Sequence, residues 1–233
     1  NKLPFRSDLK RMPLFGLGCL GGAAGVARVA DYLQGHPDEA AILLSIELCS
    51  LTIQHEDLSV ANIISSGLFG DGAAAVLMAG PDHPAARPGQ PRVIDTKSIF
   101  FPDTEHIMGW DVRDTGFKVL LSADVSEVAQ SYLRPAVELF LKKHDLTISD
   151  ISHWIAHPGG PKVIQAIESG LGLENDALKI SRESLAAVGN ISSASVLMIF
   201  EETLSRVEPS EGSYAVLMAM GPAFSAELVL LKW

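Results

Sequence analysis

Short apolar runs alternate with stretches of helical periodicity along this chain of 233 residues, and this alternation limits its fold more than any other feature. The runs at residues 40–48 and 151–156 are almost continuously apolar, as in strands that are covered on both faces. Between the runs, apolar residues recur at the spacing expected of helices that bury one face. Strands and helices that intermix in this way predict an α/β or mixed α/β fold.

The same patterns predict the individual elements. Helices are expected at residues 21–33, 125–144, 161–170 and 192–207, and strands at residues 40–48, 73–79, 92–101, 151–156, 214–220 and 224–232. Ser192 is a candidate N-cap for the last helix. Residues 75–79 and 215–219 share the sequence AVLMA, and each copy follows a small-residue helix that begins with a Gly-polar step. This coupling predicts a duplicated architecture.

Composition excludes several classes of protein. The chain has 18 Lys and Arg against 28 Asp and Glu, a net charge of −10, which argues against a general binder of nucleic acid or anionic membranes. No stretch reaches the ~18 uncharged apolar residues of a membrane-spanning helix. Two cysteines are too few for a disulfide scaffold, so we expect a reducing compartment and a cytoplasmic protein.

Cys19 is the first candidate for chemistry. It follows Gly18 and precedes Leu20-Gly21-Gly22 at the start of a predicted helix. Glycines allow a ligand to approach closely, and the partial positive charge of a helix N-terminus favours a thiolate. The alternative is a small buried cysteine that only fills space. Cys49 follows a predicted strand without such glycines and is expected to be a wall residue rather than a nucleophile.

His157 and Asn190 also lie at the ends of predicted elements. His157 ends a buried strand and precedes Pro158-Gly159-Gly160-Pro161, where an imidazole can accept a proton or donate a hydrogen bond. Asn190 precedes a helix, where an amide can stabilise an oxyanion. A structural histidine and a helix cap are the alternatives, and for Asn190 taken alone the cap is the better interpretation.

Together these three residues form a coherent Cys-His-Asn set. Papain-like proteases use the same residue types in the same order, but a protease more often has an aromatic residue directly after its cysteine. The small residues after Cys19 fit a buried tunnel better. The sequence has no metal-ligand spacing, no P-loop and no dinucleotide-binding glycine motif, so no metal site is expected.

Four segments around these residues resemble type III polyketide synthases, the chalcone synthase-like family of the thiolase fold. They are residues 18–22 (GCLGG), 67–75 (GLFGDGAAA), 154–161 (WIAHPGGP) and 189–194 (GNISSA). The third is the most specific, because ketoacyl synthases that start fatty-acid chains usually have Gln-Ala-Asn after this histidine. The resemblance covers essentially the whole chain.

The resemblance implies an α/β fold of the thiolase type, with duplicated α-β-α-β-α layers. Residues 1–80 would be the remainder of an N-terminal half that carries the nucleophile, and residues 81–233 the C-terminal half that carries the histidine and asparagine. The family's chain is longer on the N-terminal side, so we expect most of the first half to be absent from this chain.

Site roles follow from the same resemblance. Cys19 resembles the acyl-accepting nucleophile, and His157 and Asn190 resemble the pair that promotes malonyl decarboxylation. Other positions also resemble functional ones: Phe69 the aromatic gatekeeper; Cys49, Thr52 and Gly109 residues that line the cavity; and Lys162, with Gly159 and Gly160, the region that receives coenzyme A phosphates.

Two substrate-contacting positions depart from the family pattern. Val119 stands where the family has a second phenylalanine, and Pro222 lies in a loop, residues 219–223 (AMGPA), that is Gly-Phe-Gly-Pro-Gly in the family. The smaller Val119 leaves space that an alkyl tail can fill, with a gain of about 0.8 kcal/mol per buried CH₂. Residues 108–111 and 116–117 also look more like microbial alkylpyrone and alkylresorcinol synthases. We therefore expect a long-chain acyl starter and a pyrone or resorcinol product.

The resemblance implies a decarboxylative Claisen condensation between a starter acyl-CoA and malonyl-CoA, followed by cyclisation. Coenzyme A thioesters are the substrates, no metal or redox cofactor is expected, and the protein is expected to be a homodimer. Two other hypotheses stay open. One is a ketoacyl synthase III-like enzyme that performs a single condensation. The other is a catalytically silent thiolase-fold subunit.

Overall fold

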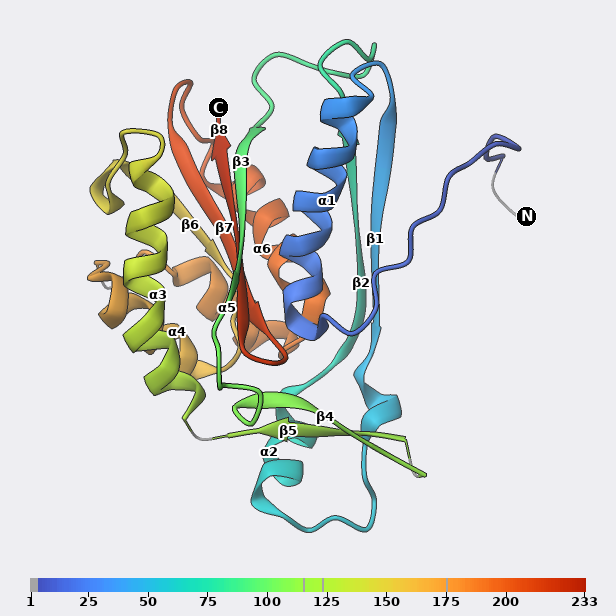
Figure 1. Cartoon of the computed structure of the whole chain (residues 1–233), viewed down its shortest axis with the longest axis vertical. Helices are drawn as coiled ribbons and strands as arrows, with labels where there is room; N and C mark the ends of the chain where they lie inside the picture. The colour runs from blue at the N-terminus through green and yellow to red at the C-terminus, as the bar shows by residue number, and fades with distance from the viewer. Residues whose placement is uncertain (1–3, 115, 123, 175) are drawn as a thin grey trace.

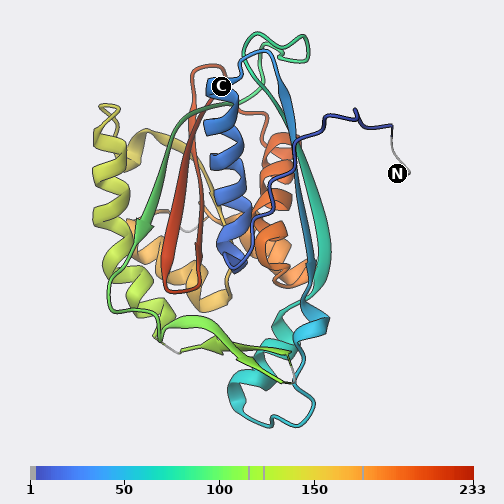
Figure 2. The ribbon, with the colours of Figure 1, turned by 45° about the vertical axis from the view of Figure 1, so that its right-hand side comes forward.

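Alternating layers of helices and sheets build the molecule (Figures 1 and 2). The computed structural model describes residues 4–114, 116–122, 124–174 and 176–233. Two helices form the central layer, α1 (Gly21–Gly35) and α6 (Ser192–Arg206). A four-stranded sheet lies on one side of this layer, and a two-stranded sheet lies on the other.

The four-stranded sheet has the order β3 (Arg92–Phe100), β8 (Ser225–Lys232), β7 (Tyr214–Gly221) and β6 (Ile151–Ala156). β6 and β7 are parallel, and the other neighbours are antiparallel. Two helices, α3 (Val125–Lys142) and α4 (Pro161–Leu171), cover its outer face.

Strand alternation explains how this sheet is buried on both sides. In β7, Ala215 and Leu217 pack against α1 and α6, whereas Val216 and Met218 pack against α3 and α4. Successive side chains point to opposite faces, so a strand between two helical layers needs apolar residues at every position. The continuous apolar runs of β6, β7 and β8 follow from this, and their prediction is confirmed.

The two-stranded sheet pairs β1 (Ala40–Leu48) with β2 (Asp71–Ala79) in antiparallel register. The expectation that β1 is covered on both faces is wrong for the part of the chain that the structure describes. Side chains on its outer face are largely exposed: Ile42 49%, Leu44 60% and Ile46 68%. Only the inner face packs against the central helices, through Leu43 of β1 and Ala74, Val76 and Met78 of β2.

The duplicated architecture is visible in the order of elements. α1 is followed by the antiparallel pair β1 and β2, and α6 is followed by the antiparallel pair β7 and β8. The AVLMA identity does not mark equivalent strands, because one copy lies in β2, the second strand of its pair, and the other in β7, the first strand. The division of the chain at residue 80 stays a prediction.

Several elements lie outside the predicted pattern. They are α2 (Val60–Leu68), β4 (Met108–Arg113), β5 (Gly116–Leu121), α5 (Lys179–Val188) and the short 3-10 helices η1 (Gly18–Leu20), η2 (Cys49–Thr52) and η3 (Ile148–Asp150). β4 and β5 form a separate antiparallel hairpin beside α2, at one end of the molecule (Figure 1). Among the described residues, no helix is long and apolar enough to cross a membrane.

Candidate active site

A cavity of about 950 Å³ lies where the central helices, the hairpin and the turn before α4 meet. All the site residues expected from the sequence line it: Cys19, His157, Asn190, Phe69, Cys49, Thr52, Gly109, Val119, Pro222, Lys162, Gly159 and Gly160. The cavity therefore brings together residues that are far apart in the chain. Their individual roles stay predictions.

Cys19 lies in η1, directly before α1. Two glycines let the chain pass closely at this point. Gly18 has a φ of +50°, and a Cβ there would lie 2.9 Å from the Pro222 ring. At Gly22 a Cβ would lie 2.2 Å from the carbonyl oxygen of Ser193, so only glycine allows α1 and α6 to approach in this way. This close approach sets Cys19 at the wall of the cavity.

The Cys19 thiol is buried, and burial raises its pKa to about 12, with the nearby Glu47 carboxylate and Cys49 adding to the increase. Hydrogen bonds with Ser192 and Asn190 act in the opposite direction. The expectation that the helix start alone yields a thiolate is therefore wrong for the free site. Desolvation outweighs the helix N-terminus, and Cys19 is a neutral thiol there.

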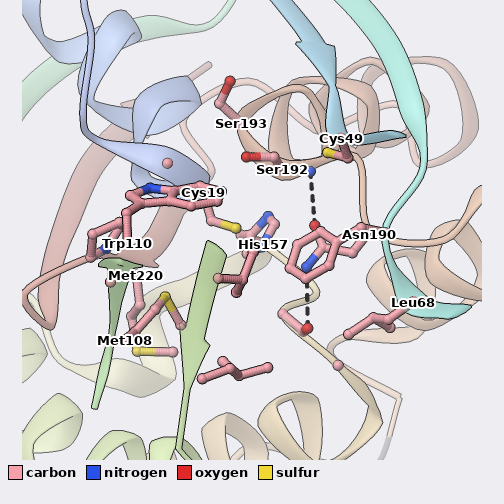
Figure 3. Close-up of a pocket in the computed structure, with 18 of the residues that line it drawn as sticks. Cys19, Cys49, Leu68, Met108, Trp110, His157, Asn190, Ser192, Ser193 and Met220 are labelled. Carbon is pink, nitrogen blue, oxygen red and sulfur yellow. Dashed lines mark hydrogen bonds between the residues drawn. The ribbon is translucent and has the colours of Figure 1, made fainter. Parts of the chain in front are cut away.

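The His157 imidazole is the group best placed to change this state. Its ring faces the Cys19 sulfur (Figure 3). Both ring nitrogens are buried, and neither has a hydrogen-bond partner among the described residues. Burial lowers the pKa of His157 to about 4, so the ring is neutral at physiological pH. An unpartnered neutral imidazole can accept a proton from the thiol, and the resulting ions would stabilise each other.

Asn190 is fixed at both ends of its amide (Figure 3). Its Nδ2 donates to the carbonyl oxygen of Gly159 at 3.2 Å, and its Oδ1 accepts from the backbone N–H of Ser192 at 2.8 Å. Because an amide nitrogen carries two protons, one remains for the cavity. The side chain thus links the turn before α4 to the start of α6 and still offers a donor beside Cys19.

These contacts also correct the predicted cap. Ser192 is the first residue of α6, with a φ of +46°, and no side-chain hydrogen bond caps the helix from the residue before it. Asn190 supplies the acceptor instead, two residues earlier than a serine cap would require. The Asn190 side chain therefore both caps the start of α6 and lines the cavity.

Two further lining residues were missed from the sequence. The Glu47 carboxylate accepts hydrogen bonds from the backbone N–H of Ser193, at 3.2 Å, and from its hydroxyl. It is the one charged residue in the apolar run 40–48, which is a signal for a polar site. Trp110 stacks edge-on against Phe117 at 5.9 Å, and both line the cavity. The hairpin that carries them was not predicted, and the only signal for Trp110 was its place next to Gly109, which was expected to line the cavity.

Comparison with known proteins assigns the family. Residues 93–233 match the chalcone and stilbene synthases, C-terminal domain, and residues 1–89 match the FAE1/type III polyketide synthase-like protein family. The chain belongs to the chalcone and stilbene synthase family. The expected resemblance to type III polyketide synthases is confirmed, and with it the thiolase-like α/β fold.

Members of this family from bacteria are similar over the whole chain. A protein named 1,3,6,8-tetrahydroxynaphthalene synthase, from Streptomyces peucetius subsp. caesius, is 50% identical over 232 residues, which cover 100% of this chain and 61% of that protein. A putative chalcone synthase from Bacillus subtilis (strain 168) is 42% identical, with 100% and 65% covered. The chain thus spans less than two thirds of the length of these relatives.

A solved structure has the same fold. The crystal structure of 1,3,6,8-tetrahydroxynaphthalene synthase from Streptomyces coelicolor A3(2), described as a bacterial type III polyketide synthase, superimposes with a TM-score of 0.92 at 32% identity. It covers 98% of this chain and 64% of that one.

Proposed function

We propose that the protein is an acyltransferase that extends a coenzyme A thioester with malonyl-CoA by decarboxylative Claisen condensation and then cyclises the chain. The observation that carries this proposal is the convergence of Cys19, an unpartnered His157 and Asn190 on one cavity. Membership of the chalcone and stilbene synthase family supports it.

In the loading step, His157 takes the proton of Cys19, and the sulfur attacks the carbonyl carbon of the starter thioester. The carbon–sulfur bond to coenzyme A breaks, and the proton returns from His157 to the departing thiolate. In the extension step, the malonyl thioester carbonyl lies between His157 and the free Nδ2–H of Asn190. Loss of carbon dioxide leaves an enolate on that oxygen, which the two donors stabilise. The enolate carbon then attacks the acyl carbon on Cys19 and releases the sulfur.

The turn before α4 is the proposed coenzyme A contact. Gly159 and Gly160 line the cavity beside Lys162, whose ammonium suits a phosphate group. We propose no metal or redox cofactor, because each step above is carried by a thiol, an imidazole and an amide.

The first candidate product is of the tetrahydroxynaphthalene type, which the 50% identity to a relative of that name supports. Such a product carries no alkyl chain, so we propose that malonyl-CoA itself is the starter. The second candidate is a long-chain acyl starter with a pyrone or resorcinol product. The observation that favours it is the mainly apolar cavity wall, where Val119 is a small residue.

One competition assay separates these candidates. The protein at its full length is incubated with malonyl-CoA alone and with added medium- or long-chain acyl-CoA, and the products are identified by mass. A product from malonyl-CoA alone that stays dominant supports the first candidate. The second candidate is supported if alkylated products dominate and if the Val119→Phe variant makes products with shorter alkyl chains. Absence of any condensation product, with a folded protein, overturns the proposed function.

A further inference from the structure

The hairpin of β4 and β5 forms one wall of the cavity without belonging to either main sheet. On β5, the alternate residues Phe117, Val119 and Leu121 line the cavity. An isolated two-stranded hairpin is marginally stable in water, so contacts with neighbouring segments must fix its position. The hairpin lies beside α2, at the lower end of the molecule in the view of Figure 1.

One ion pair joins the other face of β5 to the loop before α2. Lys118 alternates with Phe117 and Val119 and therefore points away from the cavity. Its Nζ lies 2.6 Å from Oδ2 of Asp57. The two side chains are only 23% and 20% exposed, and that carboxylate oxygen is shielded from solvent. The Lys118 ammonium and the hydrogen bonds from Ser59 lower the pKa of Asp57 to about 2, so the pair is charged at neutral pH.

The loop that carries Asp57 is itself well held. Oδ1 of Asp57 accepts from the backbone N–H of Ser59 at 2.9 Å. The Asn62 amide, on α2, donates to the carbonyl oxygens of Asp57 at 2.7 Å and of Gln54 at 2.9 Å. Lys118 therefore pairs with a loop that is held by several hydrogen bonds, and this ion pair fixes the position of β5 relative to that loop.

We propose that Asp57 and Lys118 are positioning residues that determine product specificity by fixing the β5 wall of the cavity. The inference rests on the proposed function. Cys19, His157 and Asn190 lie outside the hairpin, so loading of a small starter such as malonyl-CoA does not depend on this wall. The growing chain must fold against Phe117 and Val119 before it cyclises, so a displaced wall changes which chain length and ring closure result.

Breaking the pair from either side leaves a partly buried charge without its partner, and we expect the strand to shift towards water. Asp57→Asn and Lys118→Met should both loosen the wall. The double variant Asp57→Lys with Lys118→Asp restores opposite charges across the same gap. Lys118→Arg keeps the positive charge and tests the site with a conservative change. The matched control is Arg113→Gln, which removes the Arg113–Asp111 ion pair at 2.5 Å within the same hairpin, away from the α2 loop.

Three measurements are made on the protein at its full length. Hydrogen exchange of residues 108–121, without substrate, reports the position of the hairpin. Single-turnover acylation reports Cys19 loading, and product analysis by mass reports the ratio of products. In Asp57→Asn and Lys118→Met we expect hydrogen exchange and the product ratio to change by about threefold or more, while loading stays within about twofold. Lys118→Arg and Arg113→Gln should behave as the wild type. The charge-swapped pair should recover only part of the wild-type product ratio, because a lysine at position 57 cannot accept the hydrogen bond from the Ser59 N–H.

Two results would overturn the inference. One is a product ratio that stays constant while hydrogen exchange of the hairpin rises. The other is a Lys118→Arg variant that folds, with the wild-type melting temperature, but gives the altered products of Lys118→Met. If Asp57→Asn fails to fold, the comparison of Lys118→Arg with Lys118→Met decides the question. A wild-type protein that makes no condensation product contradicts the proposed function instead, and the hydrogen-exchange result still reports on the ion pair.

Discussion

At the scale of single residues, the site combines two titratable groups whose burial moves them in opposite directions. Cys19 is a neutral thiol because burial raises its pKa to about 12, and His157 is a neutral imidazole because burial lowers its pKa to about 4. Neither group alone is reactive at neutral pH. Their reactivity depends on the transfer of a proton between them, since the resulting charges compensate each other in a dry cavity.

The His157 shift predicts a loss of stability in acid. The folded state holds the ring neutral, so protonation favours the unfolded chain, in which histidine titrates at about 6.5. The stability contributed by this group is therefore present above pH 6.5 and is lost as the pH falls towards 4. Between pH 7 and 4.5, wild-type protein should lose about 2 kcal/mol more unfolding free energy than His157→Gln. Urea unfolding at the two pH values checks this, and parallel losses in both proteins would contradict it.

The two cysteines predict different results on acylation. Both line the cavity, but Cys19 faces the His157 ring whereas Cys49 lies at the start of η2 and is half-exposed. Incubation with acyl-CoA followed by peptide mapping should place the acyl group on Cys19. The label should disappear in Cys19→Ala and persist in Cys49→Ala. Acylation that survives Cys19→Ala and vanishes in Cys49→Ala would move the nucleophile to the second cysteine.

At the scale of elements, the site depends on a contact between two segments, one before β2 and one before α6. Residues 68–70 run beside Asn190, with the Asn190 N–H donating to Leu68 at 2.8 Å and the Gly70 N–H donating to Asn190 at 3.0 Å. This short contact holds the segment before β2, from the first half of the chain, against the segment before α6, from the second. Asn190 therefore belongs both to the chemistry and to the connection between elements.

Replacing Asn190 should separate these two contributions. Asn190→Ala loses the hydrogen bonds to Gly159 and Ser192 and should lower the unfolding free energy by about 1–2 kcal/mol. Malonyl decarboxylation should decrease more than starter loading, because only decarboxylation needs the amide donor at the enolate oxygen. Both rates are measured in single turnover beside a melting curve. Equal losses in the two steps would leave Asn190 a structural cap alone.

The elements also show how far the sequence could predict this molecule. Strands β6, β7 and β8 were predicted because each is buried on both faces and reads as a continuous apolar run. Cys19, His157 and Asn190 could be predicted as site residues because each lies next to glycines that mark a turn at the end of an element. The hairpin of β4 and β5 was not predicted, because one face meets the cavity and the other meets a loop, and this leaves no clear alternation.

Other differences arise from tertiary contacts that local patterns do not contain. The pKa of Cys19 is raised by burial and by Glu47 and Cys49, which come from the next strand and the turn after it, so the start of the helix alone predicted the wrong direction for this pKa. Likewise, the apolar outer face of β1 was predicted to be covered, because composition cannot tell which neighbouring layer is present.

At the scale of the whole molecule, the predicted homodimer stays to be tested. Residues 4–17, before η1, run along the outside of the body (Figure 1). They expose large apolar side chains, with Met12 at 72% exposed. We expect the full-length protein to be a dimer at micromolar concentration by light scattering. Met12→Asp should weaken the dimer by about tenfold, which corresponds to about 1.4 kcal/mol. A wild-type monomer at that concentration, or an unchanged dimer in Met12→Asp, would contradict this placement of the interface.

The position of β8 within its sheet has a consequence for synthesis on the ribosome. β3 and β7 are joined only through β8, which spans Ser225–Lys232, while β3 begins at Arg92. Well over a hundred residues are translated before β3 meets its neighbour, and the cavity also waits for Pro222. Because domains generally fold as units, this sheet can be completed only after β8 has been synthesised. The nascent chain must therefore keep its apolar segments from associating with other chains until residue 232 has been translated. A premature stop codon shortly before that point should yield a product that aggregates, not a folded enzyme with reduced activity.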